Sequence, residues 1–271
     1  MPISFLRSGR TPHKTWTYSA GSYIWRVLPT ADGLFIGEER DPATRQASFF
    51  CLDAANGKVL WHHIPLGDGW WTGFAATAQG VLLLHGYASP DLPQHLKIFA
   101  VDVRSGTPLW SNGSVTFTGV HGNEVHAVTP SGEPVVMDLK SGNPMPAPQS
   151  APVMDGPDES LQFPSPVDLG EAVPGVKDLL EGEPFGPAEV LAAQGYLVVS
   201  YCLRAEAGSS FTQNLTVIDP RQRKIVFSDR LLANTSVPVP DTCFARDGKL
   251  YYIQERRHLV CVRLPAKPFP V

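Results

Sequence analysis

Residues that could bind a ligand are concentrated in two aromatic stretches and at one carboxylate farther along the chain. Aromatic rings can stack on a sugar or another flat ligand, or anchor a partner protein. The same rings can equally fill a hydrophobic core, and the sequence leaves both interpretations open. The candidate ligand- or partner-binding residues are Tyr23, Trp25, Arg26, Trp70, Trp71 and Glu189.

The histidines follow no known ligand spacing. His62 and His63 are adjacent, and neighbouring residues on a strand point to opposite faces, so they cannot easily chelate one metal ion. His85, His121 and His126 lie on different predicted strands and could in principle converge on zinc, but no spacing rule supports this. We therefore expect no metal site.

No motif identifies a reaction. The sequence contains no phosphate-binding loop, no Gly-x-Ser-x-Gly elbow and no His-Glu-x-x-His helix, so the catalytic residues are unknown and no cofactor is expected. A glycosidase would need two carboxyl groups facing each other about 5–10 Å apart. Carboxylates that could supply such a pair are scattered along the chain, at Glu38, Glu39, Glu189 and Glu255.

The composition favours a fold of short strands and limits the kinds of partner. The 271 residues include 24 glycines and 26 prolines, which implies many turns, and the formal net charge is -4. No basic patch points to nucleic acid. No apolar stretch approaches the roughly 20 residues of a membrane helix, and the N-terminal apolar run is too short for a signal peptide. We expect a cytoplasmic monomer with no membrane partner.

The four cysteines give no sign of a disulfide framework. No two of them form a Cys-x-x-Cys pair, and each lies among apolar or β-forming neighbours. Free cysteine packs as a small hydrophobic residue, so we expect buried free thiols. They are Cys51, Cys202, Cys243 and Cys261.

An internal repeat organises the chain. Residues 51–61 and residues 100–110 share the pattern Asp-x-x-x-Gly-x-x-Leu-Trp, and residues 137–145 and 218–227 are weaker copies. The Asp can accept hydrogen bonds from the backbone of the turn, the Gly supplies positive φ, and the Trp begins the next strand and wedges between repeats. We therefore interpret the repeat Asp residues as turn formers.

A second signal agrees with the repeat. Five turns each precede a short β-rich run, which predicts five repeats of about 40–50 residues, the length of a four-stranded propeller blade. The turns are Asp32-Gly33, Gln79-Gly80, Gly122-Asn123, Gln194-Gly195 and Asp247-Gly248. The predicted innermost strands precede these turns, at residues 23–27, 70–75, 117–121, 188–193 and 242–246.

The final repeat lacks its last strand, and a matching strand around Trp16 occurs at the N-terminus instead. We infer that this N-terminal strand completes the last blade, which would close the ring. The sequence therefore predicts an all-β fold, a five-bladed β-propeller forming one domain over residues 1–271.

The Asp-x-x-x-Gly-x-x-Leu-Trp pattern resembles the blade repeat of quinoprotein-type (PQQ-like) β-propellers. That superfamily includes cofactor-dependent dehydrogenases and non-enzymatic assembly factors, so the resemblance implies a fold and no single activity. The adjacent-cysteine pair of many such dehydrogenases is missing, and we expect no quinone cofactor. The whole chain also resembles an uncharacterised family of small bacterial propellers.

Residues 146–186 interrupt the rhythm with a Pro-rich, acidic insertion. We expect a short helix over residues 176–181, and apolar residues such as Leu161 and Phe185 suggest that the segment packs on something. A connection this long is usually functional or disordered. It could be a passive embellishment, a lid or a partner-docking loop.

Two functions remain in view. The absence of a catalytic motif and the long insertion favour a non-catalytic binding or scaffolding propeller, with a protein partner or small-molecule ligand at its top face. The alternative is a hydrolase or lyase with its site in the central channel, acting on carbohydrate, which the group of Trp25, Trp70 and Trp71 beside Arg26 would suit.

Overall fold

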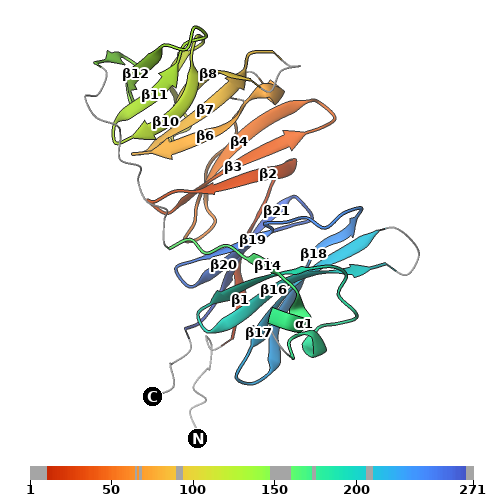
Figure 1. Ribbon diagram of the computed structural model, residues 1–271. Helices are drawn as coiled ribbons and strands as arrows, with labels where there is room; N and C mark the ends of the chain where they lie inside the picture. The colour runs from red at the N-terminus through yellow and green to blue at the C-terminus, as the bar shows by residue number, and fades with distance from the viewer. Residues whose placement is uncertain are drawn as a thin grey trace, which may run out of the picture. The chain divides into compact units, whose positions relative to one another are not determined.

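Almost all regular structure in the described residues is β. The computed structural model describes residues 11–64, 66, 69–89, 94–146, 160–172, 175–205 and 210–266, and in these ranges the strands form five antiparallel sheets (Figure 1). The described helical segments are α1 (Leu169–Ala172) and two 3-10 turns, η1 (Gly69–Trp71) and η2 (Lys177–Leu179). No helix in these ranges is long and apolar enough to cross a membrane. The predicted all-β class is confirmed.

The chain divides into two compact units. Ala20–Pro157 form one, which we call the three-sheet unit, and Met1–Ser19 together with Asp158–Val271 form the other, the two-sheet unit. Each is described by itself below. The prediction of one domain over the whole chain stays a prediction.

The three-sheet unit contains three four-stranded antiparallel sheets, each in sequential strand order. The first comprises β2 (Tyr23–Pro29), β3 (Leu34–Asp41), β4 (Gln46–Asp53) and β5 (Val59–Ile64). The second comprises β6 (Gly73–Ala78), β7 (Val81–Tyr87), β8 (His95–Asp102) and β9 (Pro108–Asn112). The third comprises β10 (Thr116–His121), β11 (Glu124–Val128), β12 (Pro134–Asp138) and β13 (Pro144–Met145).

In the sheets that carry the repeat motif, the repeat Asp residues hold the turn between the last two strands, as predicted. Oδ1 of Asp102 accepts hydrogen bonds from the backbone N–H groups of Arg104 (3.1 Å) and Ser105 (2.8 Å). Asp138 repeats these bonds at 3.1 and 2.8 Å. The turn glycines have positive φ, 70° at Gly142, for example. In the copy that lacks glycine, Arg223 adopts φ 48° four residues after Asp219, so the turn persists at the cost of a strained residue.

The repeat Trp residues join one sheet to the next, which explains why Trp and Gly recur together. The indole N–H of Trp61 donates to the carbonyl of Val103 in the following sheet (2.8 Å), and that of Trp110 donates to Leu139 (2.9 Å). A Cβ at Gly142 would lie 2.6 Å from Cδ2 of Trp110, so the ring of one repeat needs the bare glycine of the next.

The two-sheet unit carries the chain termini. Its four-stranded sheet has the order β1-β21-β20-β19, from β1 (His13–Ser19), β21 (His258–Arg263), β20 (Lys249–Gln254) and β19 (Cys243–Arg246). The N-terminal strand therefore completes the last sheet as predicted, with Trp16 opposite Cys261. The five-stranded sheet comprises β14 (Ser165–Val167), β15 (Ala188–Ala193), β16 (Tyr196–Arg204), β17 (Phe211–Asp219) and β18 (Lys224–Thr235).

The part of the insertion that the structure describes packs on this five-stranded sheet. Leu169, Val176 and Leu180 are buried in a cluster with Val199 and Ile218. The helix predicted over residues 176–181 is only the 3-10 turn η2, because the chain becomes extended at Leu180 (φ -79°, ψ 152°). Residues 147–159 and 173–174, part of the predicted insertion, lie outside the described residues.

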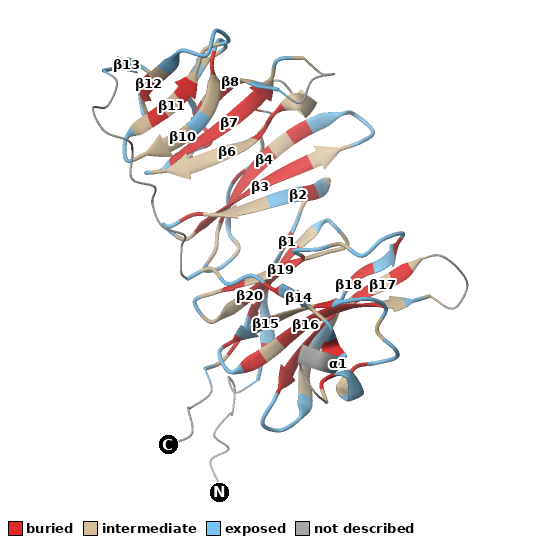
Figure 2. Ribbon diagram, viewed as in Figure 1, coloured by how far each residue is buried: buried red, intermediate tan, exposed pale blue. Residues whose placement is uncertain are grey.

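Burial is greatest on the middle strands of the sheets (Figure 2). Leu34 to Glu39 of β3 are all buried, in contrast to the half-exposed strand β2 at the edge of the same sheet. All four cysteines are buried free thiols, as expected. The edges of the sheets are therefore where side chains reach solvent.

Candidate functional site

The edge strand β2 presents an exposed aromatic residue at a β-bulge. The register between β2 and β3 shifts between Ile24 and Arg26, so Trp25 is the extra residue. Its side chain is 59% exposed, and nearby Tyr23 is 37% exposed. Bulges redirect side chains and occur often beside functional sites. The bulge therefore turns Trp25 outward from the sheet.

Trp70 and Trp71 do not lie on an innermost strand, which corrects the prediction for residues 70–75. Both belong to η1, and the strand β6 begins only at Gly73. The 3-10 turn is closed by the N–H of Thr72, which donates to the carbonyl of Gly69 (3.2 Å). Gly69 has φ 61°, a left-handed conformation that favours glycine.

Arg40, which the sequence did not single out, joins these aromatic residues. Its guanidinium lies 5.6 Å from the ring centroid of Trp25 and 5.0 Å from that of Trp70. It donates hydrogen bonds to the backbone carbonyls of Trp70 (2.7 Å) and Thr72 (3.0 Å). Cation–π contacts of this kind add to the hydrogen bonds in fixing the geometry. Arg40 thus attaches η1 to the first sheet.

Glu38 completes this arrangement. Oε1 accepts a hydrogen bond from Nε of Arg40 (2.6 Å), and the Glu38 side chain is 1% exposed. Burial raises the pKa of Glu38, while the charges of Arg40 and Arg26 oppose that shift. Glu38 and Arg40 are two residues apart on one strand, so their side chains share a face of the sheet. This alternation along a strand could have identified the ion pair from the sequence.

A row of rings extends from Trp71 into the second sheet. Trp71 makes an edge contact with Tyr87 (centroids 6.0 Å apart), and Tyr87 contacts His95 (5.0 Å). His95 stacks on His85 with centroids 3.6 Å apart. Burial lowers the pKa of His85 to about 4, and the charges of His95, Arg26 and Arg40 act in the same direction. His85 is therefore neutral near pH 7.

The histidines considered for zinc are held in other ways. His121 and His126 contact each other edge to face (5.0 Å), and Nε2 of His126 lies 3.2 Å from Oε2 of Glu124. No group of three or more metal-binding side chains occurs in the part of the chain that the structure describes. His85 and His95 stack on each other, and we interpret this contact as ring packing and not as metal binding.

Glu189 belongs to the two-sheet unit and holds a loop there. Its Oε1 accepts a hydrogen bond from the N–H of Asp241 (2.8 Å), a residue with φ 54°. Burial raises the pKa of Glu189, and the Asp241 amide opposes the shift. In the register of the sheet, Pro166 of β14 lies opposite Glu189. The contacts of Glu189 are those of a carboxylate that positions the chain leading into β19.

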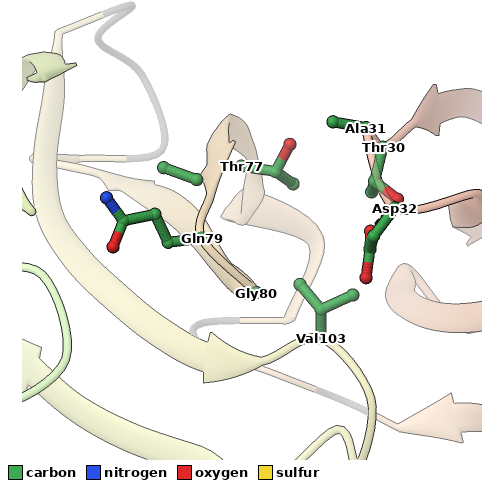
Figure 3. Close-up of a pocket in the computed structure, with 8 residues that line it drawn as sticks. Thr30, Ala31, Asp32, Thr77, Gln79, Gly80 and Val103 are labelled. Atoms are coloured by element: carbon green, nitrogen blue, oxygen red, sulfur yellow. Dashed lines mark hydrogen bonds between the residues drawn. The ribbon is translucent and has the colours of Figure 1, made fainter. Parts of the chain in front are cut away.

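A cavity of about 380 Å³ lies at the turns of the first two sheets of the three-sheet unit (Figure 3). The Asp32 carboxylate on its wall is already bonded to Thr30 Oγ1 (2.6 Å) and to Arg104 (3.1 Å). Of the residues that line this cavity, the sequence identified only Asp32, Gln79 and Gly80, as turn residues. The lining is Thr30, Ala31, Asp32, Thr77, Ala78, Gln79, Gly80 and Val103.

Of the predicted site residues, the structure thus gathers Trp25 and Trp70 around Arg40, with Arg26 close enough to affect Glu38 and His85. Tyr23 lies opposite Arg40 in the sheet register, and Trp71 is joined through Tyr87 to the histidine stack. We call Tyr23, Trp25, Arg26, Arg40 and Trp70 the aromatic face. It can supply stacking surfaces and one exposed cation.

Comparison with known proteins leaves the family open. Residues 29–110 match a family model described as a domain of unknown function (DUF4905), a stretch that includes Glu38, Arg40, Trp70 and His85. No curated protein matches.

Three solved structures to which the chain is similar share little sequence with it. A europium-containing methanol dehydrogenase is 14% identical with a TM-score of 0.34, and the match covers 90% of this chain but only 52% of that one. BamB from Moraxella catarrhalis is 11% identical with a TM-score of 0.23, over 93% and 100% of the two chains. The designed protein Ika8 is 10% identical with a TM-score of 0.32, over 94% and 100%.

Proposed function

We propose that the protein is a non-catalytic binding or scaffolding module built as a closed five-bladed β-propeller of the quinoprotein type. Five antiparallel sheets, the repeated Trp bonds between consecutive sheets and the N-terminal strand in the last sheet support this architecture. A compact 271-residue monomer should have a radius of gyration of about 18–19 Å in small-angle scattering. A clearly larger radius at monomer mass would argue against closure.

The exposure of Trp25 is the observation that carries the binding role. A large indole that is 59% exposed loses the benefit of burial, yet Arg40 and the bulge hold it in place. Ordered exposed aromatics are enriched among binding hot spots because they bury a large area with little loss of freedom. The aromatic face would therefore recognise a ligand or a protein partner.

The charges at this face indicate the kind of ligand. Arg40 is engaged with Glu38 and with two carbonyl groups, whereas the exposed Arg26 stands beside the aromatic rings. A flat or apolar group would stack on Trp25, and an acidic group next to it would pair with Arg26. An acidic peptide with an aromatic side chain fits these requirements.

Indole N–H resonances offer a direct test, because the chain has only six tryptophans. Titration with a peptide of alternating Asp and Trp residues should shift the Trp25 and Trp70 resonances, and Trp25→Ala should weaken binding roughly tenfold or more. Leu109→Ala is the matched control, since Leu109 is 43% exposed on β9 and lies outside the aromatic face. Shifts confined to other tryptophans would contradict the proposal.

The enzymatic alternative rests on Glu38. A buried carboxyl with a raised pKa resembles a general acid, and a carbohydrate hydrolase or lyase would use such a group. A panel of nitrophenyl glycosides distinguishes the two functions. Turnover that disappears in Glu38→Gln but persists in Trp25→Ala would favour the enzyme over the binding module.

A further inference from the structure

The insertion supplies extra backbone pairing to two sheet edges in the two-sheet unit. We call residues 162–167 the strap. Ser165, Pro166 and Val167 pair with Val190, Glu189 and Ala188 of β15. Upstream, the N–H of Gln162 donates to the carbonyl of Ala245 (2.9 Å), and the N–H of Ala245 donates to the carbonyl of Gln162 (2.8 Å).

Without the strap, β15 and β19 would be edge strands with unpaired backbone groups. Such edges accept an added strand from another chain, and several peptide-binding domains use this mode. In the three-sheet unit, the first strand of each sheet (β2, β6 or β10) is an edge strand. Added pairing of this kind is therefore a feature of the two-sheet unit in the described part of the chain.

A row of aromatic rings beside β19 favours an aromatic side chain in any strand that pairs with β19. The ring of Phe163 in the strap lies 6.0 Å from that of Phe244 on β19. Phe244 stacks on Tyr251 of β20 (5.2 Å), and Tyr251 contacts Trp16 of β1 (5.9 Å). The row extends across the four-stranded sheet, and Phe163 stands at its end. Pro164, next to it, is buried.

Most of the strap is exposed, although Pro164 is buried and Val167 packs against the core of the five-stranded sheet. Phe163 is 57% exposed, Ser165 and Pro166 are also exposed, and Pro166 has no N–H to donate. By contrast, Leu169 and Leu180 downstream are buried in the core. Segments with few buried contacts open at low free-energy cost. The strap can therefore leave the edge while the rest of the segment stays anchored.

We propose that the edge strands β15 and β19 of the two sheets together form a peptide-binding site. The strap occupies this site in the absence of a partner. The partner would be an extended protein segment with an aromatic residue followed by alternating prolines, in the pattern of Phe163, Pro164 and Pro166. It would take the place of the strap by pairing with the same strands. This site uses none of the residues of the aromatic face and does not depend on its function.

Gln162→Pro tests the proposal in the full chain, because it removes the N–H that bonds to Ala245 and keeps the other residues. Gln162→Ala is the matched control, since it retains both backbone bonds. The probe is a fluorescein-labelled synthetic peptide of residues 160–168, with a scrambled peptide as reference. Hydrogen exchange at the Ala245 amide and fluorescence anisotropy are measured for each variant.

In Gln162→Pro we expect exchange at Ala245 to rise about tenfold and the peptide to bind about tenfold more tightly than to the wild type, because the edge is more often open. Bound peptide should restore protection at Ala245, and Gln162→Ala should behave like the wild type. If Gln162→Pro does not fold, Phe163→Ala serves instead, since its exposed ring contributes little to the core.

A folded variant with an exposed edge that binds the peptide no better than the scrambled sequence would overturn the proposal. Unchanged exchange at Ala245 would also overturn it, because the strap would then not be what protects the Ala245 amide. A concentration-dependent dimer that excludes the peptide would overturn it in favour of strap exchange between two copies.

Discussion

At the scale of single residues, Arg40 organises the candidate site more than any residue that the sequence singled out. Its side chain connects a buried carboxylate, two backbone carbonyls and two tryptophans. A lysine could not reproduce these contacts, because the planar guanidinium donates in several directions and stacks on rings at the same time. The exposed position of Trp25 therefore depends on a residue beneath it.

Replacing Arg40 by Met should lower the free energy of unfolding by roughly 3–5 kcal/mol, because it leaves the Glu38 carboxylate buried without its partner. Glu38→Gln in the same chain should recover part of that loss. Urea unfolding of the two single variants and the double variant measures the coupling. Strictly additive losses would contradict the role assigned to the pair.

His85 makes stability depend on pH. Its pKa is about 4 in the folded protein and near 6.5 when unfolded, so the unfolded chain binds the proton more readily. The contribution is fully present above pH 6.5 and is lost as the pH falls towards 4, by at most about 3 kcal/mol. Urea unfolding between pH 7.5 and 4.5 should show a smaller decline in His85→Gln. The control variant Leu109→Ala, which changes an exposed residue that does not titrate, should decline like the wild type.

At the scale of elements, the turns and the strands are interdependent. A repeat turn needs its Asp for the backbone N–H groups, its glycine for positive φ, and a bare Cα for the indole of the preceding repeat. The turn without glycine retains the hydrogen bonds to Asp219, but Arg223 then adopts a strained positive φ. One motif therefore serves both the hairpin and the packing between sheets.

Gly142→Ala should be more destabilising than Gly122→Ala, although both glycines have positive φ (70° and 57°). At Gly122 a Cβ meets no atom within 4 Å, so the loss is the backbone strain of about 1–2 kcal/mol. At Gly142 the Cβ also displaces the Trp110 ring, which adds roughly 1–3 kcal/mol. Thermal unfolding of both variants measures the difference. Equal losses would show that the ring moves freely.

At the scale of the whole molecule, the two ends of the chain meet in one sheet. The strand β1 pairs with β21 from Lys14 opposite Val262 to Ser19 opposite His258. Joining the termini in this way removes an exposed edge from the last sheet. It also makes the N-terminal strand indispensable to a sheet formed almost 250 positions later in the sequence.

Deleting residues 1–19 should expose the edge of β21 and bring about association between chains. Light scattering of the shortened chain should show oligomers or aggregates, whereas we expect the full chain to stay monomeric. Adding a synthetic peptide of residues 11–20 should reverse this by restoring β1. A shortened chain that stays monomeric and fully folded would contradict the proposed role of β1 in the sheet.

The sequence by itself determined most of the strands, the repeat turns and the membership of β1 in the last sheet, but it wrongly placed Trp70 and Trp71 on a strand. These features depend on local rules, such as Asp and Gly at fixed spacing and alternating apolar residues, and the repeat shows the same rule several times. The tertiary structure decided the site. Arg40 joins Trp25 to Trp70 across 45 positions, His85 stacks on His95, and the strap lies along β15 and β19. Such contacts depend on how strands distant in sequence are packed, which no local pattern encodes.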